Sequence, residues 1–229
     1  MPVRKKAPED LTAKKALALE VIRRLKAEYP DAGCTLDYDH AWQLLVSVRL
    51  AAQCTDARVN IVVEELFAKY PSVAALAAAE PEDIEAIVKP CGLGHSKARD
   101  ISACMRMLRD KYDCRVPDTF EALLALPGVG RKSANLIMGD VFGKPAIVTD
   151  THCIRLCNKI GLVDGIKEPQ KVEMALWKII PPEEGSDLCH RFVMHGRAVC
   201  NARKPECEKC CLKDICRTAR EAAGLQADP

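Results

Sequence analysis

The sequence predicts an all-α protein with two helical lobes. Apolar residues recur three and four positions apart along most of the chain, and no run alternates apolar and polar residues as a strand does. Most of these stripes follow a capping residue or a proline at a first-turn position. With 229 residues, of which 48% are hydrophobic, the chain can bury one large core or two modest ones. Two compact lobes are the better interpretation.

Six helices are predicted in the first half of the chain. The first has an apolar stripe over residues 16–25, the second begins near Asp39, and the third begins after Thr55. A cap or a proline marks the starts of the next three, which follow Ser72, Pro81 and Ser96.

Five more helices are predicted in the second half. Asp118 and Glu121 have the spacing of a capping box and predict a short helix that ends at Leu126. The remaining helices are expected at about 130–141, from Asp150 onward, at 172–180 and at 187–199. No repeat, low-complexity tract or Gly/Ser linker is present, so any division into lobes falls within the helical array.

Four cysteines near the end of the chain, Cys200, Cys207, Cys210 and Cys216, follow the spacing C-x6-C-x2-C-x5-C. A stretch this short cannot form a hydrophobic core, so the sulfurs need another reason to converge. Disulfides, a tetrahedral zinc ion and an iron–sulfur cluster are the three alternatives. Only Cys207 and Cys210 form the C-x2-C pair of common zinc sites. The spacing alone leaves zinc and an iron–sulfur cluster both open.

The expected compartment disfavours disulfides. Residues 1–15 are charged but are not followed by the apolar core of a signal peptide, and Arg49 interrupts the best apolar window. We therefore expect a cytoplasmic protein without a membrane span, in which an odd number of cysteines, 13, is kept reduced. The other singly placed cysteines are interpreted as small buried apolar residues: Cys34, Cys54, Cys91, Cys104, Cys114, Cys153, Cys157 and Cys189.

The charge distribution is more informative than the net charge of +2. Residues 126–160 and 186–220 each contain more Lys and Arg than Asp and Glu, which leaves the rest of the chain acidic. Because its net charge is small, such a chain can bind a polyanion through one positive face without binding polyanions indiscriminately. Solvated helix faces would give the same pattern, so charge alone does not decide between the two.

A glycine turn between two predicted helices occupies residues 126–130, and Lys132 and Ser133 follow it. Gly128 and Gly130 are expected to adopt positive φ and to let the backbone approach another molecule. The amides at the start of the second helix favour an anion such as phosphate. A nucleotide-binding P-loop does not fit, because Arg131 stands where that motif has glycine and a helix precedes the turn. Docking on a DNA backbone fits better, although an inert turn is the alternative.

Three motifs in this order resemble the endonuclease III family of helix-hairpin-helix DNA glycosylases. They are LPGVGRKSAN at 126–135, VTDTHCIRLCNKIGL at 148–162 and the four-cysteine loop, and the likeness extends over about residues 15–216. The resemblance implies a [4Fe–4S] cluster on Cys200, Cys207, Cys210 and Cys216. Cys211 adjoins Cys210 and is interpreted as a bystander.

The resemblance places the family's nucleophile on Lys132 and its catalytic carboxylate on Asp150. A lysine amine that attacks C1′ of a damaged nucleoside displaces the base and leaves an imine, which permits β-elimination of the 3′ phosphate. A lysine has an unperturbed pKa of about 10.4, and a helix dipole, at about 0.3–1 kcal/mol, is too weak to remove its proton alone. We expect desolvation by bound DNA, with help from Asp150, to do most of this. For an anonymous helical protein, the alternatives are a phosphate contact and a simple helix cap.

Other residues are expected to contact DNA. By resemblance, Gln53 fills the space of a flipped-out nucleotide and Leu93 wedges into the opposite strand. Gly94 and His95 depart from the bulkier residues expected after such a wedge, which leaves the opposite-strand contacts open. The turn residues Gly128, Gly130 and Arg131 are expected at the DNA backbone, as are Arg203 and Lys204, because the cluster would hold their loop rigid.

The sequence therefore predicts a monomeric, bifunctional DNA glycosylase and abasic-site lyase that acts on oxidised pyrimidines in duplex DNA. We expect a six-helix, barrel-like domain at 34–144 that contains the helix-hairpin-helix, and a second domain from 1–33 and 145–229 that carries the cluster. One alternative is an adenine-mismatch glycosylase, but that class lacks the lysine and usually has a further carboxy-terminal domain, for which no room is expected here. The other alternative is a non-catalytic DNA-binding iron–sulfur protein.

Overall fold

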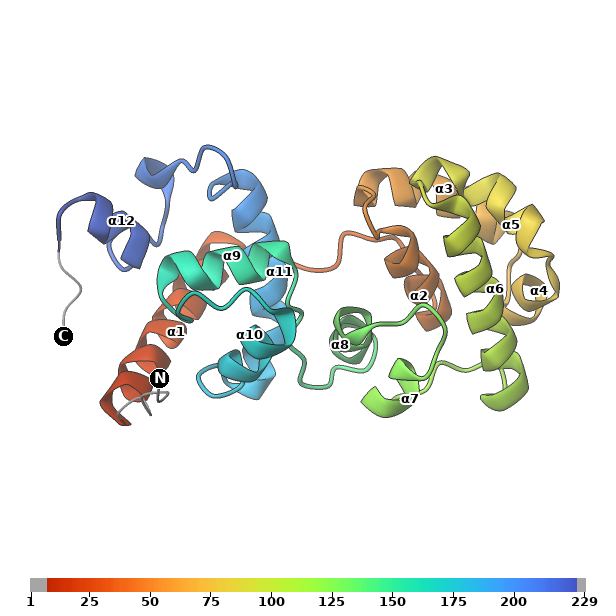
Figure 1. Cartoon of the computed structure of the whole chain (residues 1–229), viewed down its shortest axis with the longest axis horizontal. Helices are drawn as coiled ribbons and strands as arrows, with labels where there is room; N and C mark the ends of the chain where they lie inside the picture. Colours follow the sequence, from red (N-terminus) through yellow and green to blue (C-terminus); the bar gives the residue numbers. More distant parts are fainter. Residues whose placement is uncertain (1–7, 226–229) are drawn as a thin grey trace, which may run out of the picture. The chain divides into compact units, whose positions relative to one another are not determined.

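The computed structural model describes residues 8–225, and within this span every regular element is an α- or 3₁₀-helix (Figure 1). The prediction of an all-α, two-lobed fold is confirmed. The chain divides into two compact units, one formed by Cys34–Gly143 and the other by the segments up to Gly33 and from Lys144 onward. In the part of the chain that is described, no helix combines the length and the apolar character that crossing a membrane requires.

The unit Cys34–Gly143 consists of seven α-helices and one short 3₁₀-helix. They are α2 (Ala41–Leu50), α3 (Asp56–Lys69), α4 (Val73–Ala78), α5 (Pro81–Val88), η1 (Lys89–Cys91), α6 (Gly94–Lys111), α7 (Phe120–Leu124) and α8 (Arg131–Asp140). The long helix α6 packs on α4 and α5, and α2 packs on α3, α6 and α8. Fully buried apolar residues from α2, α3, α4, α5 and α6 form the core, among them Leu44, Leu66, Leu76, Ile84 and Leu108.

Local hydrogen bonds explain where these helices begin. The hydroxyls of Thr55 and Ser72 accept from the amides of Arg58 and Ala75, as expected of N-caps. The prediction near Asp39 was slightly early, because α2 begins at Ala41 and the side chain of Gln43 accepts from the amides just before it.

Two further helix starts differ from the prediction. The helix expected after Ser96 begins earlier, at Gly94, and its cap is Leu93 in a left-handed conformation. The capping box predicted at Asp118 is wrong, because Thr119 caps α7 by accepting from the amide of Ala122. That helix also ends at Leu124, before the predicted Leu126.

The other unit brings the start of the chain together with its second half (Figure 1). Its elements are α1 (Pro8–Glu28), α9 (Thr151–Ile160), α10 (Pro169–Leu176), η2 (Pro182–Glu184), α11 (Gly185–Ala198), η3 (Cys207–Lys209) and α12 (Arg217–Ala222). Helix α11 packs on both α1 and α9, and α12 packs on α9. Helix α10 begins at Pro169 and ends before the predicted Ile180, since the chain turns tightly after Leu176. Helix α12 was not predicted from the sequence.

The singly placed cysteines are only partly buried as predicted. Cys91, Cys104, Cys153, Cys157 and Cys189 are buried, whereas Cys34 and Cys54 are half-buried. For Cys114 the prediction was wrong. This residue is exposed in the turn that ends α6, where its φ is 58° and its amide donates to the carbonyl of Leu108.

Candidate functional site

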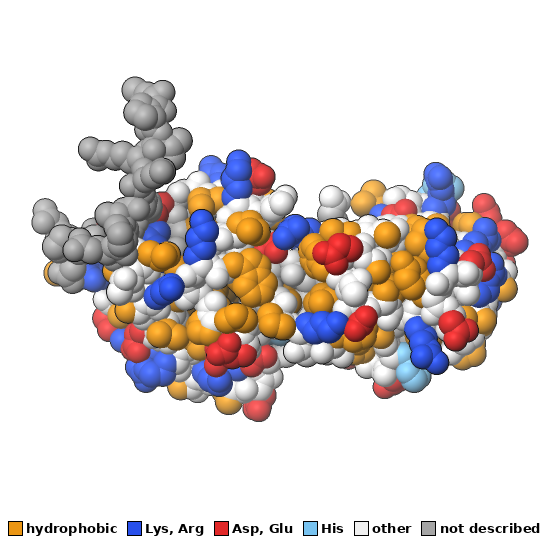
Figure 2. Space-filling view, turned by 90° about the horizontal axis from the view of Figure 1, so that it is seen from below, with side chains coloured by type: hydrophobic (Ala, Val, Ile, Leu, Met, Phe, Trp, Pro, Cys, Tyr) orange, Lys and Arg blue, Asp and Glu red, His pale blue; other side chains and the backbone are white. Residues whose placement is uncertain are grey.

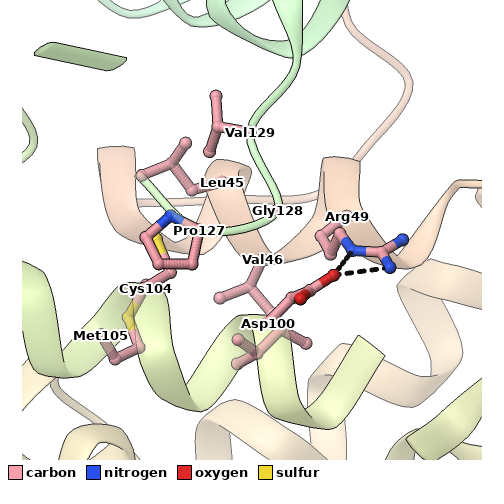
Figure 3. Close-up of a pocket in the computed structure, with 10 residues that line it drawn as sticks. Leu45, Val46, Arg49, Asp100, Cys104, Met105, Pro127, Gly128 and Val129 are labelled. Carbon is pink, nitrogen blue, oxygen red and sulfur yellow. Dashed lines mark hydrogen bonds and ion pairs between the residues drawn. The ribbon is translucent and has the colours of Figure 1, made fainter. Parts of the chain in front are cut away.

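The glycine turn between α7 and α8 lies directly on an ion pair from two other helices (Figure 3). Gly128 has a φ of 74°, and a Cβ atom built there would lie 2.8 Å from Cβ of Asp100 and 3.1 Å from Cδ of Arg49. Both its left-handed backbone and this close contact require glycine. The amide of Val129 donates to the carbonyl of Leu126 and closes the turn. The contact with Arg49 and Asp100 therefore fixes the position of the turn.

The ion pair under the turn was not recognised in the sequence. Arg49, at the end of α2, donates from Nε to Asp100 Oδ2 on α6 at 2.7 Å, and its Nη2 donates to the hydroxyl of Ser96 at 3.2 Å. Leu45, Val46 and Pro127 line the same small pocket (Figure 3). The pair thus ties α2, α6 and the turn together. Its partners lie 51 positions apart, so no local sequence pattern could have revealed it.

Gly130 adopts a different backbone conformation from the predicted one. Its φ of −97° and ψ of 176° are extended backbone that any residue adopts, and a Cβ atom there would meet nothing within 4 Å. The expectation of positive φ at this glycine was wrong. Gly130 is the N-cap of α8, and its carbonyl accepts from the amide of Ala134.

Helix α8 presents Lys132 in its first turn. The Lys132 side chain is exposed, and no hydrogen bond or ion pair involves it within residues 34–143. Arg131 is half-buried, and its guanidinium lies 4.9 Å from the centre of the Phe120 ring. The first amides of α8 carry the positive end of the helix dipole, which suits an anion such as a DNA phosphate. The turn therefore offers an accessible amine beside an anion-binding helix start.

Gln53 and Leu93 share an unusual backbone conformation in the same unit. Their φ values are 58° and 51°, in the left-handed region that few residues other than glycine adopt. Both side chains are exposed, and Leu93 is 57% accessible, which is high for a large apolar residue. Strained residues of this kind persist where the surrounding structure holds them, and they concentrate at functional positions. The two residues predicted to enter the duplex, Gln53 and Leu93, are thus exposed on strained backbone.

Asp150 belongs to the other unit and is the N-cap of α9. Its Oδ1 accepts from the amide of Cys153 at 2.7 Å, and the residue is half-buried. Its φ of −86° and ψ of −178° are extended, as is usual for a cap. One carboxylate oxygen therefore has a structural task.

The four predicted cluster cysteines line one common pocket. Cys200, Cys207, Cys210 and Cys216 all contribute to its lining, as do Lys159, Pro205 and Lys213. Cys211 is not part of this lining, and its carbonyl accepts instead from Arg24 on α1. These four cysteines line one space without a disulfide among them, and cysteine thiolates are the donors that an iron–sulfur cluster needs. The residues present fit such a group.

Burial acts on these thiols. It raises the pKa of Cys210 to about 11 and also raises the pKa of Cys200. Because thiolates are the ligands of metal clusters, cluster binding at these residues would release protons.

A buried histidine supports the pocket from α11. His195 is 1% exposed, and burial lowers its pKa. Its Nε2 lies 3.3 Å from Sγ of Cys210, and its Nδ1 lies 3.0 Å from the hydroxyl of Tyr29 on α1. A neutral imidazole that accepts from Tyr29 donates to the sulfur, which fixes the Cys210 side chain. Nearby, Arg155 on α9 donates to the carbonyl of Cys200 at 2.7 Å.

The loop between Cys200 and Cys207, the first two predicted cluster cysteines, is held by a residue that sequence reasoning missed. The Asn201 side chain donates to the carbonyl of Lys204 and accepts from its amide, both at 2.6 Å. Arg203 and Lys204 are exposed on the turn that these bonds close. Asparagine is common in turns, so its presence at position 201 did not by itself indicate that it closes this loop.

Not all of the predicted basic excess is available to a partner. Arg191 is buried, and Arg217 donates to Asp164 and to the carbonyls of Asn158 and Val163. On the face drawn in Figure 2, Lys and Arg side chains occur beside acidic ones on the described surface. Part of the positive charge therefore holds the fold together.

Comparison with known proteins agrees with this arrangement. The family model for the HhH-GPD superfamily base excision DNA repair protein matches residues 46–182. Endonuclease III of Synechocystis sp. is 42% identical over 211 residues, which are 92% of this chain and 96% of that protein. A non-covalent endonuclease III–DNA complex is similar in structure, with a TM-score of 0.86 and 38% identity over 92% of this chain and 98% of that one. A trapped endonuclease III–DNA covalent intermediate also has a TM-score of 0.86, with 39% identity over 91% of this chain and 98% of that one.

These findings define a base excision DNA repair protein built around a helix, a glycine hairpin and a helix. Within that superfamily, the chain belongs to the endonuclease III family. It is a DNA glycosylase and lyase of base excision repair, and DNA is its partner. Membership of the family also indicates an iron–sulfur cofactor.

Proposed function

We propose that this enzyme excises oxidised pyrimidines from duplex DNA and then cleaves the strand, with Lys132 as nucleophile and Asp150 as the assisting carboxylate. The observation that carries the proposal is the exposed Lys132 amine in the first turn of α8, directly after a rigid glycine hairpin. A related endonuclease III forms a covalent intermediate with DNA, which supports an enzyme nucleophile.

The chemistry follows from a primary amine. The Lys132 amine attacks C1′ of the damaged nucleoside, the C1′–N bond breaks, and its electron pair leaves with the base, which gains a proton. Ring opening gives an imine between Nζ and C1′. The imine acidifies the C2′ proton, and loss of that proton expels the 3′ phosphate. Water then releases the lysine, so one residue accounts for base removal and strand cleavage.

Lys132 must be deprotonated before it attacks. The positive end of the α8 dipole favours the neutral amine, but by only about 0.3–1 kcal/mol, which is less than a tenfold change in population. Exclusion of water by bound DNA supplies a larger effect, because it disfavours the ammonium. Asp150 can accept the proton or stabilise positive charge on the sugar with the oxygen that does not cap α9.

Nucleotide flipping exposes the lesion to this chemistry. We assign Gln53 to the vacated space in the duplex and Leu93 to the opposite strand, since both are exposed on strained turns of one unit. The hairpin residues Gly128, Gly130 and Arg131 contact the DNA backbone, as do Arg203 and Lys204. These phosphate contacts position the duplex without reading its sequence.

The iron–sulfur cofactor is assigned as a [4Fe–4S] cluster on Cys200, Cys207, Cys210 and Cys216. Their shared pocket supports the assignment, and the exclusion of Cys211 from its lining supports a bystander role for that thiol. The bound cluster supplies a rigid anchor for the loop that bears Arg203 and Lys204. We further propose that the enzyme acts as a monomer in the cytoplasm, with access to the nucleoid in a bacterial cell.

The adenine-mismatch alternative is disfavoured by Lys132, because that class lacks a lysine at this position. Borohydride reduction during incubation with a duplex that contains an oxidised thymine tests the proposal. The wild-type protein is expected to become covalently attached to DNA, whereas Lys132→Ala and Lys132→Arg are not. A wild-type protein that binds the duplex but gives neither adduct nor free base would favour a non-catalytic DNA-binding protein.

A further inference from the structure

Among the largest side chains that are fully buried in the described part of the chain is that of a lysine. Lys97 on α6 is 0% exposed, and burial lowers its pKa. A buried ammonium is unfavourable unless hydrogen bonds compensate for the lost water. Its Nζ donates to the carbonyls of Leu50 and Cys91, both at 2.8 Å. The Lys97 side chain therefore bridges two backbone segments through the core.

Both carbonyls stand where a helix stops. Leu50 is the last residue of α2, and Cys91 is the last residue of η1. Carbonyls at helix ends lack partners within their own helix, and a cation stabilises the negative end of the dipole. Lys97 thus satisfies two helix ends at once. The amide of Lys97 also donates to the carbonyl of Leu93 at 3.0 Å, so its backbone and its side chain serve the same region.

Each bridged segment leads at once into a left-handed turn. The chain passes from Leu50 to Gln53, whose φ is 58°, and from Cys91 to Leu93, whose φ is 51°. A side chain beyond Cβ makes this conformation unfavourable, so it persists only when the neighbouring structure enforces it. The two Lys97 hydrogen bonds fix the last helical residue before each turn. They also fix the two segments relative to each other.

We propose that Lys97 is a positioning residue that holds Gln53 and Leu93 in register for nucleotide flipping. The proposal rests on the function assigned above, in which these two side chains enter the duplex. Lys97 does not touch DNA, because it has no exposed surface. Removal of the Lys97 ammonium would leave the Lys132 amine in place on α8. It would free the turns that carry Gln53 and Leu93, which open the duplex.

A merely structural lysine would have different consequences. It would lower stability and reduce activity on every substrate alike. A positioning residue affects only the step in which a paired nucleotide leaves the stack, since a lesion without an opposite base needs little displacement. The two roles therefore separate when one lesion is presented in two contexts.

The experiment compares the wild-type enzyme with Lys97→Met, which preserves length and removes the ammonium. One substrate is a duplex with an oxidised thymine opposite adenine, and the other has the same lesion opposite a one-nucleotide gap. We expect kcat/KM of Lys97→Met to fall about tenfold or more on the paired substrate and less than about threefold on the gapped one. Lys111→Met, at the exposed end of the same helix, is the matched control and should behave as wild type on both.

A double-mutant comparison tests the route of action. If Lys97 acts through Gln53, the paired-duplex defect of Lys97→Met combined with Gln53→Ala should be clearly smaller than the product of the two single defects. Thermal unfolding of each variant reports on folding. If Lys97→Met does not fold, Lys97→Gln, whose amide keeps an N–H donor, carries the same comparison.

The outcomes separate this inference from the function it rests on. A wild-type protein that excises no lesion in either context contradicts the proposed function itself. A wild-type protein that excises both, while the Lys97 variant loses the same factor on paired and gapped substrates, overturns the positioning role alone. Independent, multiplicative defects of Lys97→Met and Gln53→Ala would also overturn it.

Discussion

In the proposed mechanism, Asp150 combines a structural task with a chemical one. Its Oδ1 caps α9 through the amide of Cys153, so a change that removes the side chain removes a cap as well as a charge. Loss of a cap costs about 1 kcal/mol, whereas loss of a general base typically slows a reaction about 10²–10⁴-fold. The two effects need a substitution that separates them.

Asparagine at position 150 makes that separation. Asn caps helices as well as Asp, so Asp150→Asn should change the free energy of unfolding by less than about 0.5 kcal/mol. Base excision should nevertheless slow by about 10² or more, because an amide neither accepts a proton nor carries charge. Denaturant unfolding and single-turnover excision measure the two quantities. A slow but equally stable Asp150→Asn supports the chemical role, and an active variant refutes it.

At the scale of an element, the glycine hairpin contains two glycines with different packing, and alanine substitutions distinguish them. Gly128→Ala places a Cβ atom 2.8 Å from Asp100 and forces a left-handed φ on alanine. We expect a loss of stability of about 2 kcal/mol or more and weaker DNA binding, since the hairpin must shift off the Arg49–Asp100 pair. Gly130→Ala is the matched control. It meets nothing within 4 Å and should lose less than about 1 kcal/mol. Equal losses of stability in the two variants, measured by denaturant unfolding, would contradict the packing described for the hairpin.

The cluster loop is the second element with a testable task. Replacing Arg203 or Lys204 with alanine should weaken binding equally across DNA sequences and lower the salt slope, log Kd against log salt concentration, by about 1 each. Asn201→Ala removes the two bonds that shape their turn but no charge. It should therefore weaken binding with little change in the salt slope. Fluorescence anisotropy over a salt series measures both, and unchanged slopes in Arg203→Ala and Lys204→Ala would exclude the loop from the interface.

How far an element can be predicted depends on the range of its determinants. The hairpin and the four cysteines are encoded in short runs, so spacing and resemblance located them. The cap of α7 was misplaced by one residue because Asp118 and Thr119 are both good caps, and only the amide of Ala122 decides between them. Arg49, Lys97 and Asn201 were missed because their partners are remote in sequence or are backbone groups.

At the scale of the whole molecule, the cysteines proposed to hold the cluster belong to only one of the two units. The four proposed ligands lie within residues 200–216, so ligation would restrain that segment, and α12 follows it directly. Metal ligation of this kind contributes directly to folding stability. The unit Cys34–Gly143 has its own apolar core and contains none of these ligands.

Removal of iron by a chelator under oxidising conditions should therefore act unequally. Amide hydrogen exchange should accelerate in residues 200–216 and in α12, and it should stay unchanged in the core of Cys34–Gly143. Cys200→Ser should reproduce the effect, whereas Cys211→Ser should retain the iron and the protection. Uniform acceleration along the chain, or loss of iron in Cys211→Ser, would contradict the assigned ligands.

The most direct test of the account is the location of the covalent bond to DNA. After borohydride reduction of the enzyme on a duplex with an oxidised pyrimidine, digestion and mass spectrometry identify the modified peptide. We predict that the deoxyribose remnant is attached to Nζ of Lys132. Attachment to another side chain, or efficient trapping of Lys132→Ala on the same duplex, would contradict the assignment of Lys132 as the nucleophile.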